Sequence, residues 1–165
     1  EMEINLNSNT IIDELMAVSA LRARSAGGRG ASRSLLTADQ LPALRGIVRM
    51  AFAELCMRLG SAVEASDMDF EDPRPDEPYS AASAMRLSLT LSGGTPKGRE
   101  LAVKRSLEHA VAMLSAAFAL GDSADGSASE LRAEAAGAVD ALRGVCAAGE
   151  AGGVGAPSRV VPFFF

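Results

Sequence analysis

Aromatic residues are scarce in this sequence. Its 165 residues include no Trp, one Tyr and six Phe, so aromatics make up 4% of the chain although hydrophobic residues make up 48%. Much of the apolar content is therefore alanine, which is the best helix former but contributes little transfer free energy when it is buried. The composition predicts a mainly helical protein, and the length suits one domain that can bury a core without metals or disulfides.

Histidine and cysteine are almost absent, which argues against several kinds of site. The single histidine, His109, has no partners in the sequence pattern that would complete a zinc site or a catalytic triad. The two cysteines, Cys56 and Cys146, lie in helical apolar patterns without CxxC spacing, which favours free buried thiols over a disulfide. We therefore predict an exposed, non-catalytic His109, no catalytic residues, no bound metal, no cofactor and no enzymatic activity.

Excess positive charge and long apolar runs are also lacking. The net charge is −5 and the pI about 4.9, whereas nucleic-acid-binding proteins need many cations to neutralise phosphates. No apolar run approaches the ~20 residues of a membrane span, and the polar, acidic N-terminus does not have the pattern of a signal peptide. These features predict a cytoplasmic protein that binds neither membranes nor specific nucleic-acid sequences.

The first half of the chain has two segments with the apolar spacing of helices. A cluster of N-cap residues at 7–10 precedes apolar positions at helical spacing that continue to about residue 24. A second start signal is the capping box formed by Thr37 and Gln40. Apolar steps of three or four follow it, so we predict that this second helix runs to about Ala65.

The second half of the chain predicts a helical hairpin. Apolar residues mark one face of a helix over about residues 97–120, and Ser127 with Glu130 forms a capping box for a last helix. The turn between the two helices is short, so we expect them to pack antiparallel. We expect the acids of these helices to be exposed, Glu108 among them, with Lys104 and Glu108 as an i,i+4 pair.

Residues 85–91 change from helical to alternating periodicity, which is typical of a half-buried strand. A lone strand leaves its backbone groups unpaired, so it needs a partner. That partner is either the short extended piece at residues 3–6 or a strand of another subunit, through β-augmentation. The apolar face of this strand is a candidate interface, and its residues are Met85, Leu87, Leu89 and Leu91.

The charge of the chain is unevenly distributed. Residues 66–80 form an acidic excursion rich in Pro, and residues 22–33 form a stretch that contains Arg but no acids. The sequence from Asp67 resembles the start of a calcium loop, but Asp72 and Pro78 stand where that loop needs a Gly and a bidentate Glu. We interpret the two segments either as solvated loops or as complementary patches that meet between neighbouring subunits.

The chain ends in a Gly-rich linker and an apolar tail, over residues 149–165. An exposed apolar segment favours aggregation unless it is buried, so the tail either folds back onto its own domain or docks on a neighbouring subunit or partner. Its interface candidates are Val160, Val161, Phe163, Phe164 and Phe165. The fold class predicted is mainly α, a four-helix bundle-like single domain over residues 1–148 with a short strand or β-hairpin excursion and an extended tail.

The order of these parts resembles small head–tail connector proteins, which are head-completion or neck proteins of tailed bacteriophages and prophages. The parts that carry the resemblance are a helix from Ile11 to Arg24, a long amphipathic helix from Leu41 to Val63, a loop and strand, and a helical hairpin from Lys97 to Ala147 with an extended tail. Within them, residues 101–114 are the most similar. The resemblance implies a non-catalytic subunit that forms a ring with copies of itself and contacts other structural proteins, in the host cytoplasm or the virion.

Two features have no counterpart in the connector pattern. They are the Gly/Arg loop at 25–34 and the Phe-rich end of the chain. The alternative function is therefore a bacterial helical adaptor or regulatory module that uses the Phe-rich tail for docking. Both hypotheses describe a protein that binds other protein chains.

Overall fold

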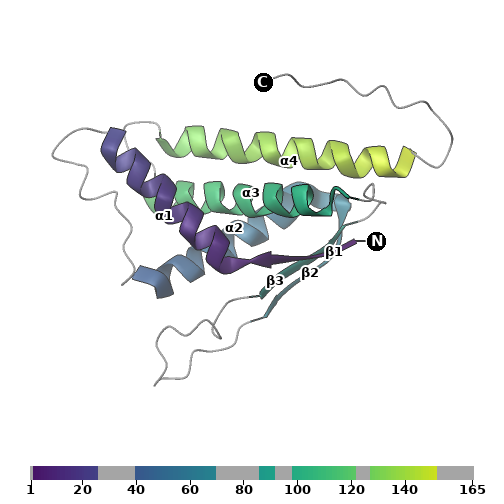
Figure 1. Cartoon of the computed structure of the whole chain (residues 1–165), viewed down its shortest axis with the longest axis horizontal. Helices are drawn as coiled ribbons and strands as arrows, with labels where there is room; N and C mark the ends of the chain where they lie inside the picture. Colours follow the sequence, from purple (N-terminus) through teal and green to yellow (C-terminus); the bar gives the residue numbers. More distant parts are fainter. Residues whose placement is uncertain (1, 26–39, 70–85, 92–97, 122–126, 152–165) are drawn as a thin grey trace.

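The computed structural model describes residues 2–25, 40–69, 86–91, 98–121 and 127–151 (Figure 1). Four α-helices and a three-stranded sheet make up this part of the chain. The elements in chain order are β1 (Met2–Asn7), α1 (Ser8–Ser25), α2 (Leu41–Leu59), the 3-10 helix η3 (Gly60–Ala62), β2 (Val63–Asp69), β3 (Arg86–Leu91), α3 (Glu100–Leu120) and α4 (Ser127–Ala151). The mainly helical character predicted from the sequence is confirmed.

The sheet has the strand order β1-β3-β2, and both pairs are antiparallel. The strand predicted at residues 85–91 is confirmed as β3. Of its two expected partners, the piece at residues 3–6 is the one that pairs with it, as β1, where Ile4 lies opposite Leu89 and Leu6 opposite Leu87. These side chains are buried, so one face of the sheet belongs to the hydrophobic core.

The second helix is shorter than predicted. α2 ends at Leu59, and Gly60 has a φ of 59°, in the left-handed region that favours glycine. The chain then enters β2, where Val63 lies opposite Leu91 of β3. The prediction of a helix to Ala65 was wrong because the spacing from Leu59 to Val63 fits both another helical turn and the apolar face of a strand.

β3 is the central strand of the sheet, with β1 on one side and β2 on the other. Three candidate interface residues, Leu87, Leu89 and Leu91, are therefore core residues of the chain itself, each with a fully buried side chain. Since both backbone edges of β3 are paired, this strand offers no edge to another subunit. The remaining interface candidates, Met85 and the tail residues Val160, Val161, Phe163, Phe164 and Phe165, lie outside the described residues.

α1 begins directly after β1, and the side chain of Asn7 caps it. Asn7 Oδ1 accepts hydrogen bonds from the backbone N–H groups of Asn9 (3.0 Å) and Thr10 (3.5 Å). This is the geometry of an N-cap residue, which satisfies N–H groups that have no partner within the helix. The prediction of an N-cap within residues 7–10 is confirmed.

The starts of α2 and α4 and the end of α4 differ from the predicted boundaries. Gln40 is the N-cap of α2, but its side chain does not form the capping hydrogen bond, and Thr37 of the predicted capping box lies outside the described residues. Ser127 is the first residue of α4 rather than its cap, and α4 continues to Ala151, into the segment predicted as a linker.

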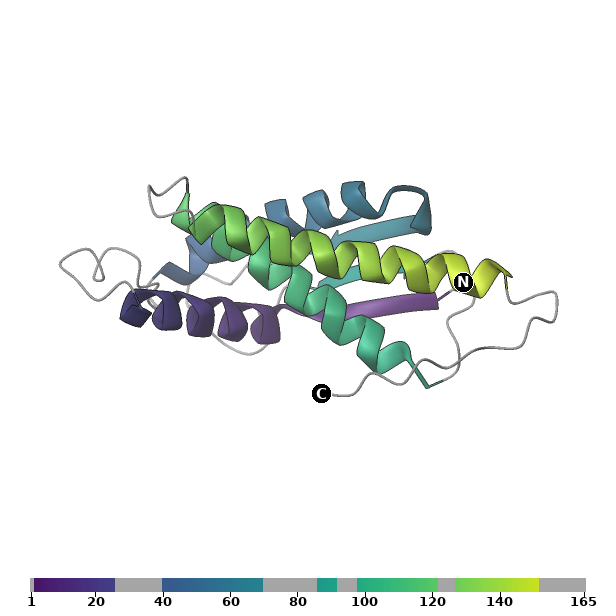
Figure 2. The same cartoon turned by 90° about the horizontal axis from the view of Figure 1, so that it is seen from above.

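α3 lies at the centre of the molecule. Figure 1 shows α4 and the sheet on opposite sides of α3, and Figure 2 shows α1 with β1 along one flank and α2 with β2 along the other. α3 and α4 run antiparallel, as predicted for the hairpin. The four-helix bundle itself is not confirmed, because the sheet forms a layer of its own beneath α3.

The core explains this arrangement. The apolar face predicted for α3, with Leu107, Val111 and Leu114, is fully buried, and so are the small residues between them. α3 therefore contacts helices on several sides, whereas α4 buries only one stripe, including Leu131 and Val139. Among the described residues, no helix is both long and apolar enough to cross a membrane.

Candidate functional site

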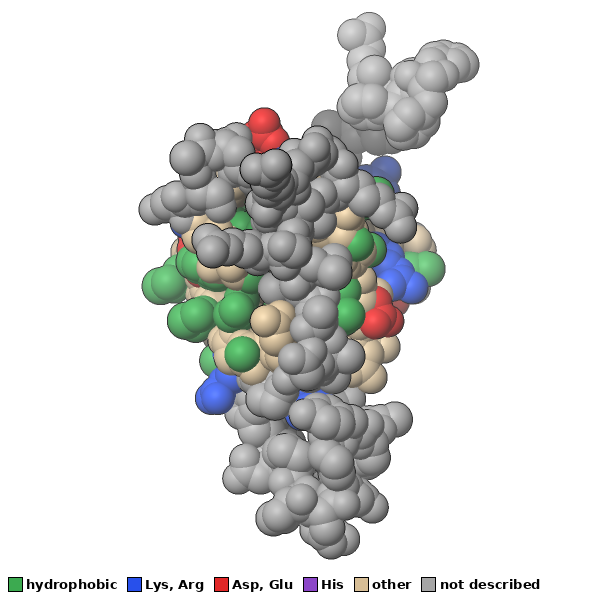
Figure 3. All heavy atoms as spheres, turned by 90° about the vertical axis from the view of Figure 1, so that its left-hand side faces the viewer, with side chains coloured by type: hydrophobic (Ala, Val, Ile, Leu, Met, Phe, Trp, Pro, Cys, Tyr) green, Lys and Arg blue, Asp and Glu red, His purple; other side chains and the backbone are tan. Residues whose placement is uncertain are grey.

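α1 and α4 both pack on α3 and leave a groove between them. The groove holds an open pocket of about 380 Å³. Its lining consists of Glu14, Val18, Leu21 and Arg22 of α1, His109 and Met113 of α3, and Leu131 and Glu134 of α4. Figure 3 views the end of the molecule where α1 ends and α4 begins, and the hydrophobic side chains that gather in this view lie mostly on the α2 side, whereas charged side chains lie on the α1 side.

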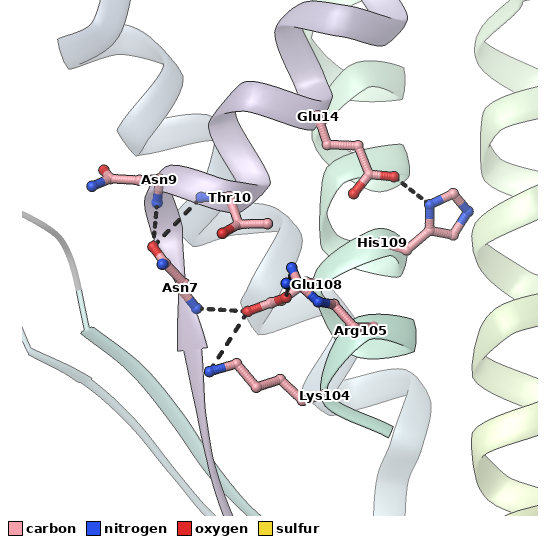
Figure 4. A network of polar contacts seen from close by, with 8 residues as sticks. All are labelled: Asn7, Asn9, Thr10, Glu14, Lys104, Arg105, Glu108 and His109. Carbon is pink, nitrogen blue, oxygen red and sulfur yellow. Dashed lines mark hydrogen bonds and ion pairs between the residues drawn. The ribbon is translucent and has the colours of Figure 1, made fainter. Parts of the chain in front are cut away.

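His109 lies between two carboxylates in this groove. Its Nδ1 is 2.5 Å from Glu14 Oε1 on α1, and its Nε2 is 3.3 Å from Glu134 Oε1 on α4. Figure 4 shows the imidazole facing Glu14. Its side chain is 37% exposed, so His109 is half-buried rather than fully exposed as predicted, and it faces two carboxylates that the sequence pattern did not indicate. One residue of α3 thus links the two helices that form the walls of the groove.

The geometry around His109 is that of mutual pairing rather than of a metal site. The two nitrogens point away from each other across the ring, so carboxylates bonded to each of them do not converge on one ion. Each nitrogen therefore has its own carboxylate, and the contact of Nδ1 with Glu14 is the shorter of the two. Within the described residues, no group of three or more His, Cys, Asp or Glu could hold a metal ion.

An ion pair closes one end of the groove. Arg22 Nη1 of α1 is 2.6 Å from Glu130 Oε2 of α4. The Glu130 side chain is largely exposed, and such a pair is worth about 1 kcal/mol or less. Its role is positional, because it joins α1 to α4 across the groove. The polar groups of the groove are therefore paired with one another, and its apolar side chains, such as Leu21, remain available.

Next to the groove, Glu108 forms a second polar cluster, and its side chain is only 1% exposed. One carboxylate oxygen accepts the backbone N–H of Asn7 at 3.0 Å and lies 3.9 Å from Lys104 Nζ. The other accepts from Arg105 Nη1 at 3.2 Å (Figure 4). The predicted pair with Lys104 is confirmed, but the prediction of an exposed Glu108 was wrong, because β1 and the start of α1 cover this part of α3.

The acidic and basic segments are only partly described. Asp67 and Asp69 belong to β2, where they extend along an edge strand, and Asp72 lies outside the described residues, so no calcium loop can be traced there. Of the basic stretch, Arg22 is in α1 and pairs with Glu130, as above. The remainder of that stretch, and the question of complementary patches between subunits, lie beyond the described side chains.

Cys56 is the one cysteine whose side chain is described, and it is a free thiol, as predicted. It lies on α2 at the margin of the core. Burial raises the pKa of the Cys56 thiol, and a hydrogen bond with the Ser66 side chain of β2 lowers it by a smaller amount. A thiol with a raised pKa is a poor nucleophile at neutral pH.

Comparison with protein-family models, curated proteins and solved structures gave no significant match.

Proposed function

We propose that this chain is a non-catalytic structural protein that assembles with copies of itself and with other structural proteins, as connector subunits of tailed bacteriophages do. The observation that supports this function is the groove between α1 and α4. Its imidazole, carboxylates and guanidinium are paired with one another, whereas Leu21 at its margin is 64% exposed. Such a surface suits the apolar side chains of a partner protein.

The pairing within the groove also favours binding over catalysis. A general acid or base must be within hydrogen-bond reach of a substrate, but both nitrogens of His109 already face glutamates of the same chain. The residues that line the groove include no Ser, Thr or Cys that could act as a nucleophile. The groove therefore resembles an anchoring pocket more than a reaction site.

Exposed apolar side chains on other elements favour more than one contact surface. Met50 and Met57 of α2 are exposed, and no residue of this helix lines the groove. A ring subunit contacts two neighbours through two different surfaces, because ring interfaces are heterologous. Apolar residues on separate faces are consistent with that requirement.

The test of assembly is the absolute mass in solution, measured by light scattering over a range of protein concentrations. We expect a large, discrete oligomer whose mass reaches a plateau, because a closed ring stops growing once it is complete. A mass equal to one chain at every concentration would contradict self-assembly.

The alternative is a bacterial adaptor or regulatory module. The size of the groove favours it, because a cavity of about 380 Å³ is near the low end of ligand pockets and suits one short apolar segment. This function predicts a small, stable monomer or dimer that captures one heterologous partner, and the same light-scattering measurement separates it from the ring.

A further inference from the structure

The outer edge of β1 is open within the described part of the chain. β1 pairs with β3 on one side only. At the end of the strand, the backbone N–H of Asn7 points away from β3 and donates to Glu108. Backbone groups of alternate residues point to the same side of a strand in an antiparallel pair. The outward N–H and C=O groups of Glu3 and Asn5 are therefore available to a further strand.

A cavity of about 530 Å³ adjoins this edge. It lies between β1 and the first turns of α3, and it is lined by Met2, Glu3, Ile4, Asn5, Glu100, Leu101 and Lys104. Leu101 is 68% exposed. Natural proteins usually cover or blunt an open sheet edge, because it can pair with other chains. The open edge of β1 beside the exposed Leu101 is therefore a surface on which another segment of polypeptide can bind.

The C-terminal segment has the residue types that a strand on this edge would need. Val160, Val161 and the three final Phe residues are β-branched or aromatic, and these types favour strands. Pro162 lacks an N–H and is tolerated on an edge strand. Residues 152–165 contain no acid, and their only charged residue is Arg159. Its charge is opposite to those of Glu3 and Glu100 at the cavity.

The segment is also long enough to reach this edge. α4 ends at Ala151, and Figures 1 and 2 both show the end of α4 and the start of β1 at the same end of the molecule. Residues 152–158 can span about 25 Å when extended. Three glycines among them allow the chain to reverse its direction after the helix.

We propose that residues 159–165 add to the outer edge of β1 of the same chain as a fourth strand and cover Leu101. The pairing is confined to the stretch of Glu3 and Asn5, because Glu108 already occupies the N–H of Asn7. The sheet order becomes tail-β1-β3-β2. This inference concerns contacts within one chain and does not depend on the proposed assembly.

The test uses NMR of the full-length chain, with and without the triple substitution F163S/F164S/F165S. In the unmodified chain we expect slow amide hydrogen exchange at Glu3 and Asn5, and the substitution should accelerate it by about tenfold or more. The methyl signals of Leu101 and Ile4 should shift, whereas that of Met57 on α2 should not. Unchanged exchange at Glu3 and Asn5 would overturn the proposal, as would changes confined to β2, the other edge of the sheet.

A matched pair of substitutions tests the apolar contact. Leu101→Asn should accelerate exchange at Glu3 and Asn5, whereas Leu21→Asn, at an equally exposed leucine of α1, should not. Equal effects of the two substitutions would count against the cavity as the docking surface. The exchange rates should not vary with protein concentration, and a marked dependence would overturn docking within one chain. None of these readouts reports the oligomeric mass, so this proposal and the assembly proposal can fail separately.

Discussion

At the scale of single residues, Glu108 stands out because it is the one buried residue with a carboxylate side chain in the described core. Transfer of a charge away from water is costly unless partners replace its hydration. Lys104, Arg105 and the N–H of Asn7 provide these partners. Glu108 thereby fixes the corner between β1 and α1 against α3.

The first prediction follows from that role. Glu108→Ala should lower the free energy of unfolding by about 2 kcal/mol, because it leaves the N–H of Asn7 without its acceptor in a covered position. Urea denaturation measures the change. The matched control is Asp140→Ala on α4, where the carboxylate is exposed and pairs only weakly with Arg143. A loss no larger than that of the control would contradict the structural role of Glu108.

The second prediction concerns Cys56. Because burial raises its pKa, the folded state favours the neutral thiol. The contribution of the Cys56 thiol to the free energy of unfolding is therefore complete below the pKa that the thiol has in the unfolded chain. It decreases as the pH rises toward the higher pKa that the thiol has in the folded chain. In a Cys146→Ser background, the free energy of unfolding should fall at alkaline pH.

The control for this pH dependence is Cys56→Ala in the same background, which should flatten the alkaline slope. Alkylation gives an independent readout, since native Cys56 should react with iodoacetamide more slowly than the same thiol in urea. Equal rates in the two conditions would argue against burial as the cause of the shift.

At the scale of elements, Gly60 decides where α2 stops. Its φ of 59° lies in a region that L side chains rarely adopt. The chain needs this conformation to turn from α2 through η3 into β2. Residues of higher helix propensity at this position would favour continuation of the helix and oppose the sheet.

The third prediction is a contrast between two glycines. Gly60→Ala should destabilise the protein by about 1 kcal/mol or more, because alanine is strained at positive φ. Gly137→Ala on the exposed face of α4 should stabilise it by up to about 1 kcal/mol, since alanine is the better helix former and a Cβ there meets no atom within 4 Å. Urea denaturation of both variants is the measurement, and effects of the same sign would contradict this account of the turn.

At the scale of the whole molecule, helices pack over a three-stranded sheet, and exposed apolar side chains lie on more than one face of the protein. The groove between α1 and α4 and the outer edge of β1 share no lining residue, although α3 contributes to both. One is assigned to partners and the other to the chain's own tail. The two assignments make opposite predictions for two leucines of similar exposure.

The fourth prediction uses this difference. If the groove is a subunit contact, Leu21→Asn should reduce the oligomeric mass in light scattering, because a polar side chain replaces an apolar anchor. Leu101→Asn should leave that mass unchanged, since the tail of the same chain covers this position. A mass that responds to Leu101→Asn but not to Leu21→Asn would reverse the two assignments.

Much of the fold could be predicted from local pattern. The N-cap at Asn7, the alternating apolar residues of β3 and the hairpin of α3 and α4 were anticipated, and the pairing of β1 with β3 was one of two alternatives. Each signal involves residues close in sequence, or a strand with few available partners. Val63 shows the limit, because its spacing suits a helix as well as a strand, and only the position opposite Leu91 decides between them.

The candidate site could not be predicted in this way. Periodicity tells which face of a helix is apolar, but not which residues of other elements lie against it. Glu14 and His109 are 95 residues apart, and Asn7 and Glu108 are 101 apart. These contacts exist only because α1 and β1 pack along α3.

The sequence by itself determined where most helices and strands form, because hydrogen bonding and apolar spacing within an element are local. Only the tertiary structure decided that Glu108 is buried, that His109 links two helices, and that Leu87, Leu89 and Leu91 are core residues. The physical reason is that the burial and partners of a side chain depend on what packs against its face. Which elements pack together depends on the whole chain and not on any one segment.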